Sequence, residues 1–381
     1  MIYLDHNAIT PMRPEAVEAV ERALRTFGNP SSVHAAGRIA RDVLDEARGR
    51  VARALSARPA EMIFTSGATE SAALAIRGAL AVAPPGRRAL AVAAVEHPCV
   101  LDLARELARD EGVPVQVAPV DARGVLDVEA LRQAVGEETA LVCCMLANNE
   151  TGVVQPAAEA AAVARRAGAL FFCDVVQAVG KVRVEPGALG ADLAAVTGQK
   201  FGGPRGAGAL WIRPDLGLRP LFGGHQERGR RAGTENLPGI AGLGAAIEAA
   251  TAARRVEEPR IRSLRDRLEG GLLAAVPRSR VNGAGAERLP TTASIAFEGC
   301  DSEALLIAMD LEGICAGAGA ACTSGSTTPS HVLSAMGLSP LQARATIRFS
   351  VGWSTTPEEI EAAVRIVPPL VERVRREIHM P

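Results

Sequence analysis

The chain has 381 residues, a formal net charge of −1 and a hydrophobic fraction of 48%. This length suggests two domains, each large enough to bury a core. The near-neutral charge argues against a role on nucleic acid or at a membrane surface. No run of about 18 apolar, uncharged residues occurs, and residues 1–6 do not resemble a signal peptide, so we expect a cytoplasmic protein.

The first large part of the chain alternates between strand-like and helical patterns. From about residue 60 to 212, short apolar runs are separated by stretches rich in alanine, arginine and glutamate. This alternation predicts a mostly parallel sheet covered by helices. The expected strands and helices, in chain order, are 88–95, 99–110, 114–120, 128–135, 139–146, 157–167 and 169–173.

A long helical stretch from Ile240 to about Ala275 is the natural crossing into a second domain, and Pro259 could interrupt it. Pro368 and Pro369 should divide the last helical region into two, because neither proline can donate the intrahelical hydrogen bond. Between these stretches we expect strands and a helix at 292–297, 302–311 and 345–351.

Lysine is nearly absent, which makes its two positions informative. Of 42 Lys and Arg residues only Lys181 and Lys200 are lysines. Lys200 follows a strand-like run, and Asp174 and Gln177 stand at the end of another. A lysine, a carboxylate and an amide near strand ends suit pyridoxal phosphate: they bind its aldehyde, its pyridinium N–H and its ring oxygen, respectively. Lys181 lacks such a setting and is predicted to lie on the surface.

A turn of small residues, 65–71, opens a predicted helix after a strand-like run. The free N–H groups and the positive dipole end of such a helix suit a phosphate. The alternative is a helix simply capped by Ser66 or Thr69. Beside Asp174 and Lys200, the phosphate site is the favoured interpretation.

Three further polar residues stand in strand-like segments or at their ends. His97 could stack on a cofactor ring and move protons near neutral pH, although a lone histidine is more often structural. Asn149 is either a plain turn residue or a donor to the ring oxygen and a substrate carboxylate. Arg348 could hold a carboxylate with its guanidinium fork or form an ordinary salt bridge.

The seven cysteines are scattered and odd in number, which favours reduced thiols over a disulfide framework. Cys143 and Cys144 lie in an apolar run and are predicted to be buried. Cys322 differs, because its neighbours are glycine, alanine, serine and threonine. It is a poor core residue and a good exposed nucleophile.

Together these segments resemble the cysteine desulfurases of the NifS/IscS type, in the class V aminotransferase group. The resemblance covers nearly the whole chain. It implies an α/β protein with the pyridoxal-phosphate-dependent transferase fold type I, whose large domain holds a mostly parallel seven-stranded sheet and whose smaller C-terminal domain is α+β. The large domain would span 13–254, and the small domain 1–12 and 255–381. The motifs that carry the resemblance are 3–8, 27–32, 65–71, 148–152, 227–236 and 351–352.

The resemblance also implies roles for single residues. Lys200, Cys322 and His97 would be catalytic, and Asn149 and Arg348 would bind the substrate. No intrinsic metal is expected, although Cys322 would be a transient cluster ligand shared with a scaffold protein. Gln199 departs from the histidine usual in the family. The cofactor would be held by Ala68, Thr69, His97, Asn149, Asp174, Gln177, Thr197, Gly198, Gln199 and Lys200, and by Thr234 of the neighbouring subunit in a homodimer.

The implied activity converts L-cysteine to L-alanine and moves the sulfur to Cys322 as a persulfide, for delivery to an acceptor such as an iron–sulfur scaffold protein. One alternative is a selenocysteine lyase or another β-lyase, which would not depend on Cys322. Another is a catalytically weak pyridoxal-binding regulatory partner, suggested by Gln199 and by alanines at 72–73. The presence of Lys200, Cys322 and Arg348 counts against that second alternative.

Overall fold

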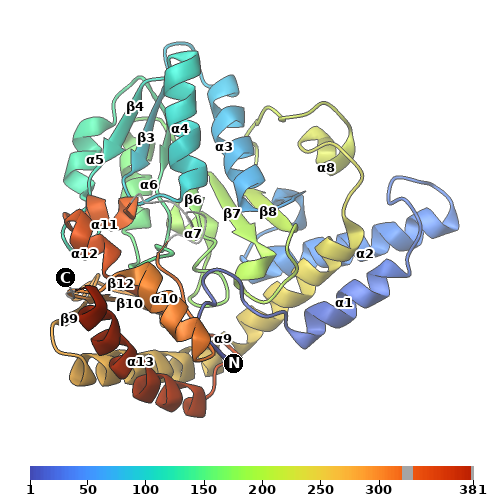
Figure 1. Ribbon diagram of the computed structural model, residues 1–381. Helices are drawn as coiled ribbons and strands as arrows, with labels where there is room; N and C mark the ends of the chain where they lie inside the picture. The colour runs from blue at the N-terminus through green and yellow to red at the C-terminus, as the bar shows by residue number, and fades with distance from the viewer. Residues whose placement is uncertain (320–328, 379–381) are drawn as a thin grey trace.

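A computed structural model describes residues 1–319 and 329–378 (Figure 1). Its largest sheet has seven strands, and all but two of the pairings are parallel. Five neighbouring strands, at one side of the sheet, pair in parallel throughout, whereas β8 (Gly208–Ile212) pairs antiparallel with both of its neighbours. The predicted mostly parallel sheet is therefore confirmed. In spatial order the strands are β2 (Met62–Thr65), β8, β7 (Leu193–Thr197), β6 (Leu170–Asp174), β5 (Thr139–Cys143), β3 (Ala89–Ala93) and β4 (Val115–Ala118).

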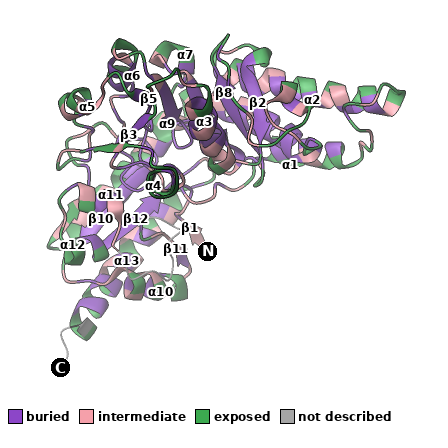
Figure 2. Ribbon diagram, turned by 90° about the horizontal axis from the view of Figure 1, so that it is seen from above, coloured by how far each residue is buried: buried purple, intermediate pink, exposed green. Residues whose placement is uncertain are grey.

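Helices cover both faces of this sheet, and the strands are buried throughout most of their length (Figure 2). Successive side chains of a strand point to opposite faces, so a nearly continuous apolar run can serve two cores. In β3, Leu90 packs with one cluster and Ala91 with the other. Cys143 and Cys144 are buried, as predicted. The main helices of this part are α1 (Pro14–Leu24), α2 (Ala35–Ala54), α3 (Ala68–Val82), α4 (Pro98–Glu111), α5 (Val128–Ala134) and α6 (Ala157–Arg166).

A second apolar cluster surrounds a small antiparallel sheet in the order β12 (Thr346–Ser350), β10 (Thr292–Phe297) and β9 (Ser279–Val281). Helices α10 (Ser302–Leu311) and α13 (Pro357–Ile378) pack on it. Near the other end of the chain, β1 (Ile2–Tyr3) pairs in parallel with β11 (Ile314–Cys315). The remaining short helical elements are η1 (Pro59–Glu61), α7 (Pro186–Leu189), η2 (Gly198–Lys200), α8 (Gln226–Gly229), α11 (His331–Ala335) and α12 (Pro340–Arg344).

Both predictions of proline breaks are wrong. Helix α9 (Leu237–Ala275) continues through Pro259, and α13 continues through Pro368 and Pro369. A proline inside a helix loses one backbone hydrogen bond. In α13 the burial of Val367 and Val371 in the second cluster compensates for that loss. Neither long helix, nor any other in the described part of the chain, is apolar and long enough to cross a membrane.

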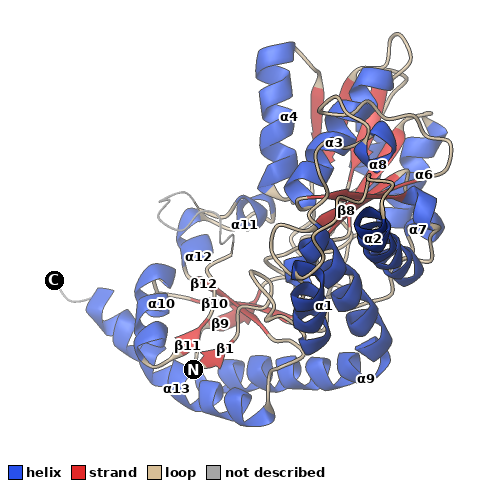
Figure 3. Ribbon diagram, turned by 90° about the vertical axis from the view of Figure 1, so that its right-hand side faces the viewer, coloured by secondary structure: helices blue, strands red, loops and turns tan. Residues whose placement is uncertain are grey.

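Helix α9 joins the two halves of the molecule, as the side view shows (Figure 3). Its residues up to Ala250 pack under the large sheet, whereas those from Ile261 onward pack against the small sheet. We therefore keep, as a proposal, the division into a domain of residues 13–254 and a domain of residues 1–12 and 255–381.

Candidate active site

The predicted lysine, carboxylate and amide lie at one edge of the large sheet. Asp174 is the last residue of β6, Gln177 follows in the next turn, and Lys200 comes directly after β7. β6 and β7 are parallel neighbours, with Asp174 opposite Ala195. Their carboxyl ends therefore meet at the edge where open α/β sheets bind ligands.

Lys200 is half-buried, and the N-terminal segment surrounds its amine. Its Nζ donates to the carbonyl oxygens of Asn7, at 2.8 Å, and Ala8, at 2.7 Å. Thr10 donates its hydroxyl to the Lys200 carbonyl at 3.1 Å. The segment around Asn7 is thus part of the site, although it lies almost 200 residues away along the chain.

Asp174 is buried, with an exposed fraction of 7%. Its Oδ1 accepts the N–H of Val176 at 2.9 Å, and no hydrogen bond is recorded for Oδ2 within the described residues. Burial raises the pKa of Asp174 to about 6, against the opposing effects of the Val176 N–H and the Lys200 amine. A buried carboxylate with an oxygen to spare is suited to a cationic N–H partner.

The prediction that Lys181 lies on the surface is wrong. It is 8% exposed, and its Nζ donates to Gln177 Oε1 at 2.6 Å and to Asn7 Oδ1 at 3.2 Å. The turns at 175–182 run inward beside the N-terminal segment, and the spacing of four residues brings Lys181 next to Gln177. The Nε2 of Gln177 donates to the Asn7 carbonyl at 3.0 Å.

The start of α3 offers unpaired backbone donors. Gly67 is its N-cap and supplies no side-chain hydrogen bond, so the alternative of a helix capped by Ser66 or Thr69 is wrong. The first N–H groups of a helix have no intrahelical partner and are directed toward the positive end of its dipole. A Cβ at Gly67 would lie 3.5 Å from Thr197 Oγ1, so α3 begins close to the end of β7.

The neighbouring polar side chains leave further donors for an anion. The Thr197 hydroxyl donates to Gln199 Oε1 at 2.5 Å, which leaves the Gln199 NH2 group able to donate elsewhere. Gly198, between them, is buried, and a Cβ there would lie 2.7 Å from the Pro204 carbonyl oxygen. Ala68 is half-buried and Thr69 is exposed at the same helix end.

His97 is the N-cap of α4, and its Nδ1 accepts the N–H of Cys99 at 3.2 Å. Burial lowers the pKa of His97 to about 4, with further lowering by Lys200 and His331. The imidazole is therefore neutral at neutral pH, with its proton on the other ring nitrogen. A neutral ring suits stacking on another ring rather than binding an anion.

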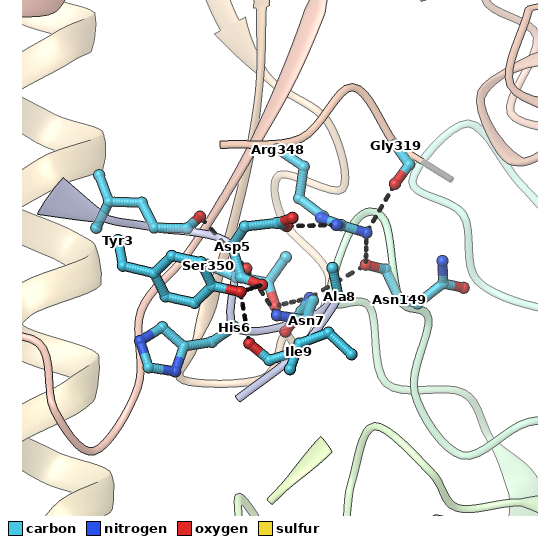
Figure 4. A network of polar contacts seen from close by, with 12 residues as sticks. Tyr3, Asp5, His6, Asn7, Ala8, Ile9, Asn149, Gly319, Arg348 and Ser350 are labelled. Atoms are coloured by element: carbon cyan, nitrogen blue, oxygen red, sulfur yellow. Dashed lines mark hydrogen bonds and ion pairs between the residues drawn. The ribbon is translucent and has the colours of Figure 1, made fainter. Parts of the chain in front are cut away.

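Arg348 belongs to a network that includes the N-terminal segment (Figure 4). It is 2% exposed, and its Nη1 donates to the carbonyls of Gly319, at 2.7 Å, and Asn149, at 3.1 Å. Its Nη2 donates to Asp5 Oδ1 at 2.7 Å, and its buried Nε has no partner within the described residues. The guanidinium is thus already paired with a carboxylate, whereas no hydrogen bond is recorded for the Asn149 side chain in this part of the structure.

Glu150 connects the segments on either side of residues 320–328. Its Oε2 accepts the Ser330 hydroxyl at 2.5 Å, and a Cβ at Gly319 would lie 2.7 Å from the same oxygen. Burial raises the pKa of Glu150. Cys322 lies outside the described residues, and Thr234 is exposed between α8 and α9.

Four side chains at this site received no role from the sequence: Asp5, Asn7, Glu96 and Lys181. Asp5 and Asn7 belong to a motif that carried the family resemblance, which was the available signal. Glu96 is fully buried, and its Oε1 accepts the Met145 N–H. The four-residue spacing from Gln177 could have indicated Lys181.

The chemistry of these groups fits pyridoxal phosphate: an amine, a buried carboxylate with a spare oxygen, and a helix start with unpaired N–H groups. The comparisons agree. A family model described as aminotransferase class-V matches residues 2–363. The chain belongs to this family of pyridoxal-phosphate-dependent enzymes and, within it, to the cysteine desulfurases.

The relatives match the chain over almost its full length. A cysteine desulfurase of Cereibacter sphaeroides is 47% identical over 98% of this chain and 96% of its own length. A solved structure named NIFS-LIKE PROTEIN superimposes with a TM-score of 0.91 at 32% identity, covering 98% of this chain and 99% of its own. A structure of SspA in complex with cysteine gives a TM-score of 0.78 at 31% identity, covering 92% and 99%. The fold is therefore the pyridoxal-phosphate-dependent transferase fold type I.

Proposed function

We propose that this chain converts L-cysteine to L-alanine and transfers the sulfur, by way of a persulfide on Cys322, to an acceptor. The observation that carries the proposal is the group formed by Lys200, Asp174 and Gln177 at the ends of β6 and β7. The name of the SspA complex supports cysteine as the substrate, because that related protein binds it.

Bound pyridoxal phosphate supplies an electron sink that stabilises negative charge at the substrate Cα. The Asp174 carboxylate would hold the proton on the pyridine nitrogen and keep the ring electron-withdrawing. The neutral His97 would cover the ring face, and the N–H groups of Ala68 and Thr69 with the Gln199 amide would bind the phosphate. The Lys200 amine would carry the Cα proton, since an uncharged amine is a base.

Cys322 would act on the substrate sulfur. Its thiolate attacks Sγ, an S–S bond forms and the Cβ–Sγ bond breaks. The electron pair of the broken bond remains on Cβ, which takes up one proton and becomes the alanine methyl group. The thiolate rather than the thiol is the nucleophile in such a step. The sulfur then passes from Cys322 to a second thiolate, which we propose to belong to an iron–sulfur scaffold or another acceptor protein.

A homodimer is part of the proposal. Side chains within residues 24–39 are unusually exposed for apolar residues, with Phe27 at 92%, Val33 at 90% and Leu24 at 67%. Exposed apolar groups gathered in one segment mark interaction sites. Thr234 is exposed too and would reach the phosphate of the neighbouring subunit.

The test is an assay of purified protein loaded with cofactor and given L-cysteine. With a thiol reductant, sulfide and alanine should form in equal amounts. Without a reductant, the peptide that holds Cys322 should gain one sulfur, about 32 mass units. Cys322→Ser should keep the spectral response to L-cysteine and form no persulfide. Sulfide release by that variant at the wild-type rate would replace desulfuration with the elimination expected of a selenocysteine lyase or another β-lyase.

A further inference from the structure

The buried position of Lys181 is energetically unfavourable for a charged amine. It is 8% exposed, and burial lowers the pKa of its ammonium well below the ordinary value, with further lowering by Lys200 and Arg348. An apolar side chain of similar length would fill the same volume without this desolvation cost. The cost suggests that the amine serves the polar groups it contacts, Gln177 and Asn7.

The contacts around Gln177 determine which end of its amide faces which way. A backbone carbonyl only accepts hydrogen bonds, whereas a lysine amine has N–H groups to donate whether or not it is charged. The Asn7 carbonyl therefore requires Nε2, at 3.0 Å, which leaves Oε1 to accept an N–H of Lys181, at 2.6 Å. Turning the amide over would set two acceptors against each other at one end and two donors at the other.

The Asn7 side chain is oriented in the same manner. Its Nδ2 donates to the Asn149 carbonyl at 3.1 Å, which leaves Oδ1 to accept from Lys181 at 3.2 Å. Lys181 thus lies between two amide oxygens whose opposite ends are fixed by acceptors. Asn7 and Gln177 are 1% and 4% exposed, so water cannot readily replace the Lys181 amine as a donor.

The orientation places a donor next to the cofactor-bearing lysine. Gln177 Nε2 and Lys200 Nζ donate to the same oxygen, the Asn7 carbonyl, at 3.0 and 2.8 Å. Gln177 Nε2 has a second N–H, for which the described residues provide no recorded acceptor. In pyridoxal phosphate the ring oxygen is attached to the carbon next to the one bearing the aldehyde, so a donor beside Lys200 is a donor beside that oxygen.

We propose that Lys181 is a positioning residue that, with the Asn7 carbonyl, fixes the Gln177 amide so that its second N–H donates to the cofactor's ring oxygen. The inference rests on the proposed role of Gln177 toward the cofactor. The charged or titratable groups that face Lys181 are Lys200, Arg348 and His6, whose pKa burial and then Lys181 lower to about 3.

The test compares Lys181→Met, Gln177→Met and the double variant, each loaded with cofactor. The readout is the pH midpoint at which the cofactor's visible absorption band changes. A donor to the ring oxygen stabilises negative charge there and weakens that oxygen's hold on the neighbouring proton. Both single variants should therefore raise the midpoint, by about 0.5–1 pH unit for one hydrogen bond. The double variant should match Gln177→Met alone, because Lys181 acts through that amide.

The possible results separate two failures. If Gln177→Met leaves the midpoint unchanged, the proposed role of Gln177 is wrong and the inference falls with it. If Gln177→Met raises the midpoint while Lys181→Met leaves it unchanged or adds a full further shift in the double variant, the role of Gln177 stands and that of Lys181 is overturned. Thermal unfolding of the cofactor-free variants provides the folding control, and Lys181→Leu carries the same expectation if Lys181→Met does not fold.

Discussion

The cofactor side and the substrate side of the site differ in how far their polar groups are already paired. On the cofactor side, Asp174 Oδ2, the second N–H of Gln177 and the first N–H groups of α3 have no recorded partner in the described structure. On the substrate side, Arg348 is bonded to Asp5, Asn149 and Gly319.

Binding of the cofactor and binding of the substrate therefore require different changes in hydrogen bonding. A cofactor meets donors and acceptors held ready by the sheet and by α3, so little rearrangement opposes its binding. Apart from the buried Nε, the donors of Arg348 serve Asp5 and two carbonyls, so a substrate carboxylate that approaches Nη1 or Nη2 must compete with these acceptors. Cofactor affinity should thus depend on how well these donors and acceptors are positioned. Substrate affinity should depend on how strongly Asp5 and the two carbonyls compete for Arg348.

The largest effect should come from Lys200→Ala, which removes the amine that binds the cofactor and carries the Cα proton. Losing both the covalent bond and the proton carrier should lower turnover by at least about 10³-fold. Borohydride reduction of the loaded wild type should place the cofactor's mass on Lys200. Lys181→Met is the matched control and should retain that mass. Finding the cofactor's mass on Lys181 in the wild type would refute the assignment of Lys200 as the lysine that binds the cofactor.

Glu96→Gln tests the buried carboxyl group on which the charge of Asp174 acts. Burial, and then Asp174, raise the pKa of Glu96 to about 8 from an ordinary value of 4.5. Between these values the folded state binds more protons than the unfolded state, so the free energy of unfolding should fall as the pH rises. Glutamine cannot ionise, so the variant should exceed the wild type above pH 8 by on the order of 2–4 kcal/mol and match it near pH 4.

Urea unfolding of the cofactor-free proteins at several pH values measures this difference. The exposed Glu137 provides a control, since Glu137→Gln should leave the pH dependence unchanged. A constant stability difference between Glu96→Gln and the wild type at all pH values would mean that folding does not change the pKa of Glu96, against the raised value given above.

Arg348→Ala should raise the KM for L-cysteine and leave the cofactor's absorption midpoint unchanged, because it acts on the substrate side alone. Losing a charge-assisted contact costs about 2–3 kcal/mol, or roughly 30- to 150-fold. Steady-state kinetics and absorbance titrations on one preparation measure both. An unchanged KM would mean that Arg348 does not bind the carboxylate and would leave the Asn149 side chain as the candidate.

Asp5→Asn should have the smallest effect, with the opposite sign. Asp5 competes with the substrate carboxylate for the Nη2 of Arg348, so its neutralisation should lower KM by roughly two- to fivefold. The same steady-state assay measures the change. A KM that rises as it does for Arg348→Ala would show instead that Asp5 holds the guanidinium in place.

The sequence predicted what local pattern determines. Apolar runs predicted the strands, and polar residues at strand ends predicted the meeting of Asp174 with Lys200. Contacts between distant segments were not predictable: Asp5 meets Arg348 across 343 positions, and Asn7 meets Lys200 across 193. Local rules also failed where packing outweighed them, as at the prolines of α13. Cys322 and Thr234 retain the roles predicted for them, as proposals.

The scarcity of lysine gives the protein an unusual chemical surface. Its 40 arginines carry the positive charge, while one lysine is buried and the other is half-buried at the cofactor site. Reagents that acylate side-chain amines therefore find almost no competing targets on the outside. In cofactor-free protein they should report the accessibility of Lys200 directly, and protection on loading should count occupied sites. Arginine-rich surfaces offer the same charge without that reactivity, because a guanidinium group stays protonated.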